Sequence, residues 1–305
     1  MPHLITTLGP KSAGDLGAIL PHEHVFVDLR TWDQPGYGEA DPADVVTLMA
    51  PEIERVRAAG ITAIIEPSAI GVGRRADILL EVSRATDFPL VVPTGVYREP
   101  WLPPWVHAAN EVDLRDWMVD ELTIQIEETG VQAGWIKVGA TDDGLTDAEA
   151  KVLRAAAGAA SETGATIGSH TVRGHVARAQ LGLIESVGAP ADCFVWIHSH
   201  QEPDIAIHHE LARRGAWIEY DGIGEPGSDD HFIDLIQRGL DVGLGERLLL
   251  GMDRGWYDPA QPGGGTPKPF TYISERFLPH LADSGVDDAT IDMLMRHNPF
   301  TAFAR

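Results

Sequence analysis

Residues 41–66 read DPADVVTLMAPEIERVRAAGITAIIE, and this stretch decides the fold class. Asp41 followed by proline is typical of a helix N-cap with proline at the first helical position, and the pattern is helical from Ala43 to Ala59. Residues 61–66 are too continuously apolar for a strand with one face in solvent. They indicate a strand that is buried on both faces, which requires a parallel sheet covered by helices.

The same unit of helix and strand recurs along the chain. Helical patterns cover residues 74–86, 113–129, 147–163, 174–187, 204–214 and 230–238, and each precedes an apolar strand, at 90–97, 134–140, 165–170, 194–198, 216–220 and 247–253. With a first strand at 20–28 and two closing helices at 270–282 and 287–297, this alternation predicts an α/β fold, a (β/α)8 TIM barrel formed by residues 1–305 as a single domain. A doubly wound open sheet is the less favoured alternative, because no glycine-rich phosphate-binding fingerprint follows the first strand.

The composition excludes several classes of partner. The chain has 23 basic and 46 acidic side chains, and its formal net charge of -23 opposes binding to nucleic acid and to anionic membranes. The single cysteine, Cys193, rules out an internal disulfide and fits a reducing compartment. The amino terminus lacks a secretory signal pattern, and no stretch approaches the roughly 20 apolar residues of a membrane span. We therefore expect a soluble cytoplasmic protein.

Ligand-type side chains lie at the expected carboxyl ends of the strands, which is where barrel enzymes place their active sites. Two histidines one residue apart share a strand face, and later strand ends add a lysine, two histidines and a carboxylate; the set is His22, His24, Lys137, His170, His198 and Asp253. Four imidazoles and a carboxylate are more ligands than one tetrahedral zinc ion needs. Two divalent ions about 3.5 to 4 Å apart would use them all, together with a bridging anion.

Lys137 has two interpretations. An inward-facing lysine in a barrel is otherwise an expensive buried cation. If its amine adds carbon dioxide, the resulting carbamate has two oxygens that can bridge two metal ions. Alternatively, the lysine pairs with Asp253 or extends its amine to the mouth of the barrel. The sequence leaves both interpretations open.

Eight short motifs carry a resemblance to a known family. In chain order they are Leu8-Gly9-Pro10, Asp15-Leu16-Gly17, Pro21-His22-Glu23-His24, Ile136-Lys137-Val138-Gly139, Ser169-His170-Thr171, Trp196-Ile197-His198 followed by Asp204, Gly251-Met252-Asp253, and Asn298-Pro299-Phe300. Together they resemble the phosphotriesterase family of the amidohydrolase superfamily, most closely its phosphotriesterase-like lactonase branch. The resemblance implies a binuclear metal-dependent hydrolase on a (β/α)8 barrel, and the family often forms homodimers, so we expect a homodimer.

The resemblance also assigns the ligands. It implies that His22, His24 and Asp253 hold the more buried metal ion and that His170 and His198 hold the more exposed one. A carboxylated Lys137 (N6-carboxylysine) would bridge both. Mixed imidazole and carboxylate ligation suits zinc, our first expectation, and also cobalt, manganese or iron.

This chain departs from the family pattern at two points. Pro21 stands where the family often has threonine, serine or methionine, and Ile197 stands where it often has glycine. The segment His198-Ser199-His200 places both histidines on one strand face, so His200 is an alternative to His198 as a ligand.

A metal-bridging hydroxide attacking a lactone or carboxylic ester is the expected reaction, with Asp253 as the general base. Phosphotriester hydrolysis is the alternative, and a non-catalytic metal-containing binding barrel is a second alternative. The lactonase-like branch places a tyrosine near the hydroxide at the position of Tyr97, which we count as a catalytic and substrate-binding residue. Further substrate-binding candidates are Trp101, Arg173, Arg254 and Trp256, although packing against the barrel rim would equally explain a tryptophan.

Two other residues have structural expectations. Glu23 points away from the histidines on either side, so we expect it to support or pack against the site rather than to bind metal. His208 falls on a polar helix face, where we expect a surface or capping role.

Overall fold

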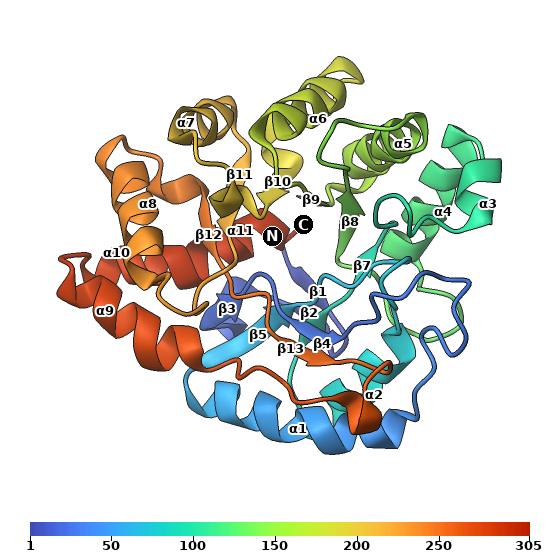
Figure 1. Cartoon of the computed structure of the whole chain (residues 1–305), viewed down its shortest axis with the longest axis horizontal. Helices are drawn as coiled ribbons and strands as arrows, with labels where there is room; N and C mark the ends of the chain where they lie inside the picture. Colours follow the sequence, from blue (N-terminus) through green and yellow to red (C-terminus); the bar gives the residue numbers. More distant parts are fainter.

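The computed structural model describes all 305 residues and shows a TIM barrel, with the strands around a central axis and the helices outside them (Figure 1). In chain order the strands of the barrel are β3 (Ala18–Leu20), β4 (His24–Phe26), β5 (Ile61–Ile65), β6 (Leu90–Val91), β7 (Pro93–Thr94), β8 (Trp135–Gly139), β9 (Ile167–His170), β10 (Phe194–Ile197), β11 (Trp217–Tyr220), β12 (Leu248–Leu250) and β13 (Gly255–Tyr257). A separate hairpin precedes them and consists of β1 (Leu4–Thr6) and β2 (Gly9–Lys11).

Parallel pairing runs through β3, β5 and β6, and then from β7 to β12 in sequence order. The strand β13 pairs in parallel with β4 in a separate two-stranded sheet. A glycine starts this strand: Gly255 has φ +95, and a Cβ there would meet the carbonyl oxygen of His24.

The outer ring consists of α1 (Pro42–Ala58), α2 (Ala76–Thr86), α3 (Pro104–Ala108), α4 (Glu111–Thr123), α5 (Asp147–Thr163), α6 (Gly174–Ser186), α7 (Ile205–Arg214) and α8 (Asp229–Asp241). Most of the predicted helices are present, but the prediction over 113–129 is wrong at its end. There α4 stops at Thr123, and the N–H of Ile126 instead donates to the carbonyl of Val131 to close a turn.

The carboxyl-terminal helices also differ from the prediction. The segment combines π-helical turns at Ile273–Phe277 and Met293–His297 with α9 (Leu278–Asp283), α10 (Asp288–Asp292) and α11 (Asn298–Phe303). Asn298 starts α11, and its side-chain amide donates to the carbonyls of Gly245 and Leu248. These two hydrogen bonds hold the helix against the start of β12 and the turn before it. None of the helices has the length and apolar character needed to cross a membrane.

The core has two parts separated by the sheet. A larger cluster fills the space between strands and helices, and a smaller one fills the barrel itself. Inside the barrel, residues from alternate positions of the strands form an apolar layer: Ile19, Ala63, Ile65, Val91, Trp135, Val195, Ile197, Trp217 and Leu249. Ligand-type side chains lie above this layer, toward the carboxyl ends of the strands.

Candidate metal centre

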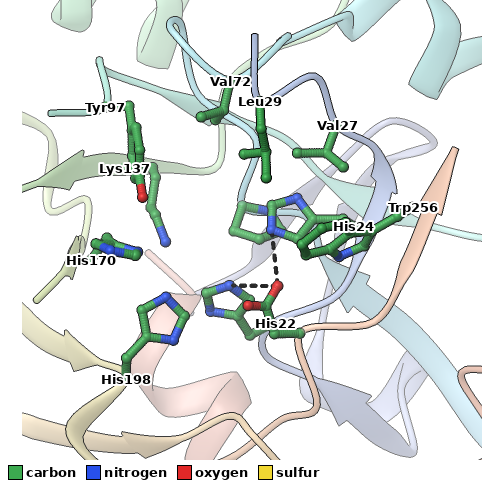
Figure 2. A pocket seen from close by; sticks show the side chains of 12 residues that line it. His22, His24, Val27, Leu29, Val72, Tyr97, Lys137, His170, His198 and Trp256 are labelled. Atoms are coloured by element: carbon green, nitrogen blue, oxygen red, sulfur yellow. Dashed lines mark ion pairs between the residues drawn. The ribbon is translucent and has the colours of Figure 1, made fainter. Parts of the chain in front are cut away.

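The six predicted ligand groups line one cavity of about 130 Å³ at the carboxyl ends of the strands (Figure 2). They come from five parts of the barrel: His22 and His24 from the segment that begins β4, Lys137 from within β8, His170 from the end of β9, His198 from the turn after β10 and Asp253 from the turn after β12. The rings of His170 and His198 have centroids 4.4 Å apart, and those of His22 and His198 are 5.3 Å apart. The fold therefore brings together every residue that the sequence nominated as a ligand.

Three of the imidazoles are oriented by buried acceptors behind them. Nδ1 of His22 lies 2.6 Å from a carboxylate oxygen of Glu219, and Nδ1 of His198 lies 2.8 Å from one of Asp221. In the tautomer that donates from Nδ1, each ring leaves the lone pair of Nε2 free for a metal ion.

His24 is held by a longer relay. Its Nδ1 lies 2.7 Å from the hydroxyl of Ser68, which in turn lies 2.7 Å from a carboxylate oxygen of Glu66. A carboxylate or hydroxyl acceptor behind each ring fixes its tautomer and its direction. Such backing is typical of metal-ligating histidines.

Asp253 presents an unpaired oxygen to these rings. Its Oδ1 is buried and has no hydrogen-bond partner, yet it lies 3.2 Å from Nε2 of His24 and 3.8 Å from Nε2 of His22. Ligand atoms of His22, His198 and Asp253 all lie within 4.8 Å of one another. Burial opposes the charged form of Asp253, but the contact with His24 outweighs burial and holds the pKa of Asp253 far below the usual range, so the carboxylate stays ionised.

Lys137 lies inside the barrel with only 2 % of its surface exposed, and its amine has no hydrogen bond or ion pair. It therefore neither pairs with Asp253 nor extends to the mouth of the barrel, which were the alternatives open at the sequence level. Burial lowers the pKa of the amine. A neutral amine is the form that adds carbon dioxide, so this environment suits the carbamate.

This donor set fits divalent metal ions. Burial lowers the pKa of His22 and of His170 well below the ordinary value, so both rings are neutral, as ligands must be. The buried Oδ1 of Asp253 has no hydrogen-bond partner in the protein, and a bound cation would satisfy it. Four imidazoles, a carboxylate and a convertible lysine form a set that suits zinc and its first-row neighbours.

The geometry separates His198 from His200. His198 has φ +63, and this left-handed turn directs its ring into the cavity. His200 does not line the cavity. It lies in the short 3-10 turn Ser199–Gln201 and packs against Phe232, with its Nδ1 3.2 Å from a carboxylate oxygen of Asp221. The arrangement favours His198 as the ligand.

His208 is not at the surface, which corrects our expectation. It is 1 % exposed and packs between Trp196 and Tyr220. Its two ring nitrogens lie 3.1 Å from the Tyr220 hydroxyl and 3.0 Å from the carbonyl oxygen of Glu202. The polar helix face that we expected to reach solvent is covered at this point by the barrel.

The substrate-binding candidates occupy different positions. Tyr97 and Trp256 line the cavity, and Tyr97 meets His170 edge-on with centroids 5.0 Å apart. Trp101 packs behind Tyr97 and donates from Nε1 to the carbonyl of Leu29 at 2.8 Å. Arg173 is exposed and outside the cavity wall.

Arg254 also lies outside the cavity wall. Its guanidinium lies over the ring of Tyr272 and donates to the carbonyl of Gly224, so it joins two loops.

Sequence reasoning missed the groups behind the ligands and part of the rim. Glu219 lies in β11, and Asp221 directly follows this strand. Two acidic residues at the end of an otherwise apolar strand were the signal from which these groups could have been predicted. Burial raises the pKa of Glu219, while the contacts with His198 and His200 keep the pKa of Asp221 low against the effect of burial. At the rim, Arg98 stacks on the rings of Tyr97 and Trp101 and makes no ion pair or hydrogen bond; its Nε is buried.

Comparison with known proteins identifies the family. The model of the phosphotriesterase family matches residues 2–303. The chain belongs to the phosphotriesterase family. It is similar to the phosphotriesterase homology protein of Escherichia coli, with 28 % identity over 291 residues, 94 % of this chain and 98 % of that protein.

Solved structures of similar proteins agree with this family assignment. A mutant of the organophosphorus hydrolase from Deinococcus radiodurans has a TM-score of 0.89 and 29 % identity, covering 99 % of this chain and 97 % of that one. A mutant PTE-like lactonase from the same organism has a TM-score of 0.87 and 30 % identity, covering 98 % and 99 %. This phosphotriesterase-family chain is therefore a hydrolase of a metal-dependent family, with candidate metal-binding residues in the expected place.

Proposed function

We propose that this protein hydrolyses lactones or carboxylic esters with the help of two divalent metal ions, zinc being the first expectation. The observation that carries the proposal is the place of Tyr97, whose ring meets His170 on one side and lines an apolar wall on the other. A carbonyl group at the ligand cluster would have this phenol beside it. The likeness to a structure described as a PTE-like lactonase supports the same substrate class.

The proposed ligand assignment follows the positions in the cavity. One ion would be held by His22, His24 and Asp253, the other by His170 and His198, and carboxylated Lys137 would lie between them. When bound, two such ions supply a nucleophilic hydroxide at neutral pH and polarise the substrate oxygen.

The protein's own groups have separate roles in the proposed reaction. Asp253 accepts a proton through its carboxylate, which faces the cavity. Tyr97 orients the substrate with its hydroxyl, and since burial raises its pKa the phenol remains a hydrogen-bond donor. The apolar wall of Val27, Val72 and Trp256 holds the carbon skeleton and excludes water.

The rim adds a preference for charge. Arg98 is a guanidinium without an acidic partner in a chain whose net charge is -23, and it stacks on the ring of Tyr97. We infer that substrates with an anionic substituent gain a charge-assisted contact there, so the panel of test substrates pairs each neutral compound with a carboxylate-bearing analogue.

The test is a comparison of kcat/KM on metal-loaded protein across γ- and δ-lactones, aryl carboxylic esters and an aryl phosphotriester. The proposal expects lactones or esters to exceed the phosphotriester. Turnover of the phosphotriester alone would favour the alternative activity, for which the likeness to an organophosphorus hydrolase is the supporting observation. Absence of lactone and ester turnover would overturn the proposal.

A further inference from the structure

Glu23 lies between His22 and His24 but faces away from the metal cavity. Its side chain is fully buried, and both of its oxygens accept backbone hydrogen bonds from the far end of the chain. Oε1 accepts from the N–H of Met252 at 2.9 Å, and Oε2 accepts from the N–H of Arg254 at 2.9 Å. One carboxylate therefore accepts the backbone N–H groups of the two residues on either side of Asp253.

The backbone of Asp253 is in a conformation that needs such support. Its φ of +52 lies in the left-handed region, which is unfavourable for a residue with a Cβ. Backbone contacts tie the same two segments together: the N–H of Asp253 donates to the carbonyl of His22, and the N–H of His24 donates to the carbonyl of Arg254. The strand that carries the first two histidines is thus joined to the turn that carries the aspartate.

We propose that Glu23 is a positioning residue that fixes Asp253 in its metal-binding orientation. The alternation of the strand lets one segment supply two ligands on its inner face and the clamp for a third ligand on its outer face. The inference goes beyond the proposed substrate class and rests on the metal centre of the proposed function. Because the clamp acts through Asp253, its removal should weaken metal binding even when the fold is intact.

The experiment compares Zn²⁺ affinity of the metal-free chain with that of Glu23→Gln, by competition with a chelating dye at neutral pH. The glutamine side chain has the same shape, but its NH₂ group would face one of the two backbone N–H donors. We expect affinity to fall by about 10- to 100-fold, the range found when groups behind metal ligands are replaced. Circular dichroism and thermal unfolding of the metal-free proteins report separately on the fold.

Glu149→Gln is the matched control. Glu149 is 2 % exposed, and its carboxylate also accepts two backbone hydrogen bonds, from Thr146 at 3.0 Å and from Glu99 at 3.2 Å, but neither residue adjoins a proposed ligand. This variant should lose a similar amount of thermal stability and retain the affinity of the wild type for Zn²⁺. If Glu23→Gln does not fold, Glu23→Asp retains the charge but is too short to reach both N–H groups, and it should show the same loss of affinity.

The outcomes separate this inference from the proposed function. Wild-type affinity in a folded Glu23 variant overturns the clamp and leaves the metal centre standing. An equal loss of affinity in Glu149→Gln also overturns it, since the effect would then follow from general destabilisation. A wild-type chain that binds no Zn²⁺ overturns both the clamp and the metal centre on which it rests.

Discussion

Trp135 and Lys137 lie two residues apart on β8 and point to the same interior of the barrel, yet they belong to regions with opposite properties. Trp135 is fully buried in the apolar layer and meets Phe303 edge-on at 5.2 Å. Lys137, two residues further along the same strand, is also buried, but its amine has no hydrogen bond or ion pair and lies 5.9 Å from the centroid of the Trp135 ring. The strand alternation places both side chains inside; the chemistry of each layer decides whether burial stabilises the protein or costs stability.

The same division runs through β11. Trp217 lies in the apolar layer, and Glu219, two residues on, contacts His22 from behind. Apolar packing dominates the lower layer, where Trp217 adds one hydrogen bond to the carbonyl of Asp192 and Nε1 of Trp135 has no acceptor. The upper layer instead holds charged groups that the protein leaves partly unpaired. The polar groups that a bound ligand would satisfy therefore lie on an apolar core that needs no ligand.

The largest expected effect is at the upper layer. Asp253→Asn retains the shape of the side chain but removes the proton acceptor, so turnover of the best substrate should fall by about a thousandfold. The measurement is kcat/KM on metal-loaded protein, beside affinity for a non-hydrolysable substrate analogue. Unchanged turnover would contradict the enzymatic role, and an activity that is absent in both proteins would favour a binding barrel.

The complementary change breaks the lower layer. Trp135→Ala removes a fully buried ring from the barrel interior and should lower the free energy of unfolding by about 3 to 5 kcal/mol. Urea unfolding followed by circular dichroism measures the change. Lys137→Ala should be neutral or stabilising in the metal-free protein in the same assay, because the variant removes a buried group without a partner; a similar loss in both variants would contradict the division into layers.

His208, a buried histidine outside the metal cavity, should make the free energy of unfolding depend on pH. Burial lowers the pKa of His208 to about 4, below the ordinary 6.5, so the folded protein favours the neutral ring. Above pH 6.5 the ring is neutral in both states and costs no stability. As the pH falls from 6.5 toward 4, the unfolded chain binds the proton first, and the free energy of unfolding falls by about 3 kcal/mol. Unfolding free energies at pH 7.5 and pH 4.5 should differ more in the wild type than in His208→Asn. Equal differences would contradict this account of His208.

The smallest expected effect is at the rim. Trp101→Phe retains the ring that packs on Tyr97 but removes the hydrogen bond to the carbonyl of Leu29, worth about 1 kcal/mol. Because this bond joins two loops over the cavity, KM should rise several-fold while kcat changes little. Steady-state kinetics on a lactone measures both, and a fall in kcat with constant KM would contradict a role in holding the loops.

The barrel and the gathering of the candidate ligands at one mouth could be predicted from the sequence because both depend on local periodicity. Alternation places Lys137 on the inner face of its strand, and strand ends in a barrel meet at one mouth. Contacts between distant segments were not predictable in this way. The pair His22 and Glu219 is separated by 197 residues, and nothing local in either segment announces the other.

Backbone turns account for the remaining differences. The choice between His198 and His200 depends on a left-handed residue at the end of β10, where strand alternation no longer applies. The burial of His208 depends on how α7 packs on the barrel, and its helical face looked polar in isolation. Local patterns therefore predicted which residues gather at the mouth, while tertiary packing determined which groups hold them.

Metal content per chain, beside Lys137→Ala, tests the central claim most directly. The protein would be purified without chelators and in the presence of bicarbonate, then examined by elemental analysis. The account predicts about two metal ions per chain in the wild type and a clear loss in the variant, because two ions sharing one site need the bridging carbamate. One ion or none in the wild type, or full occupancy in Lys137→Ala, would contradict the bridged binuclear centre.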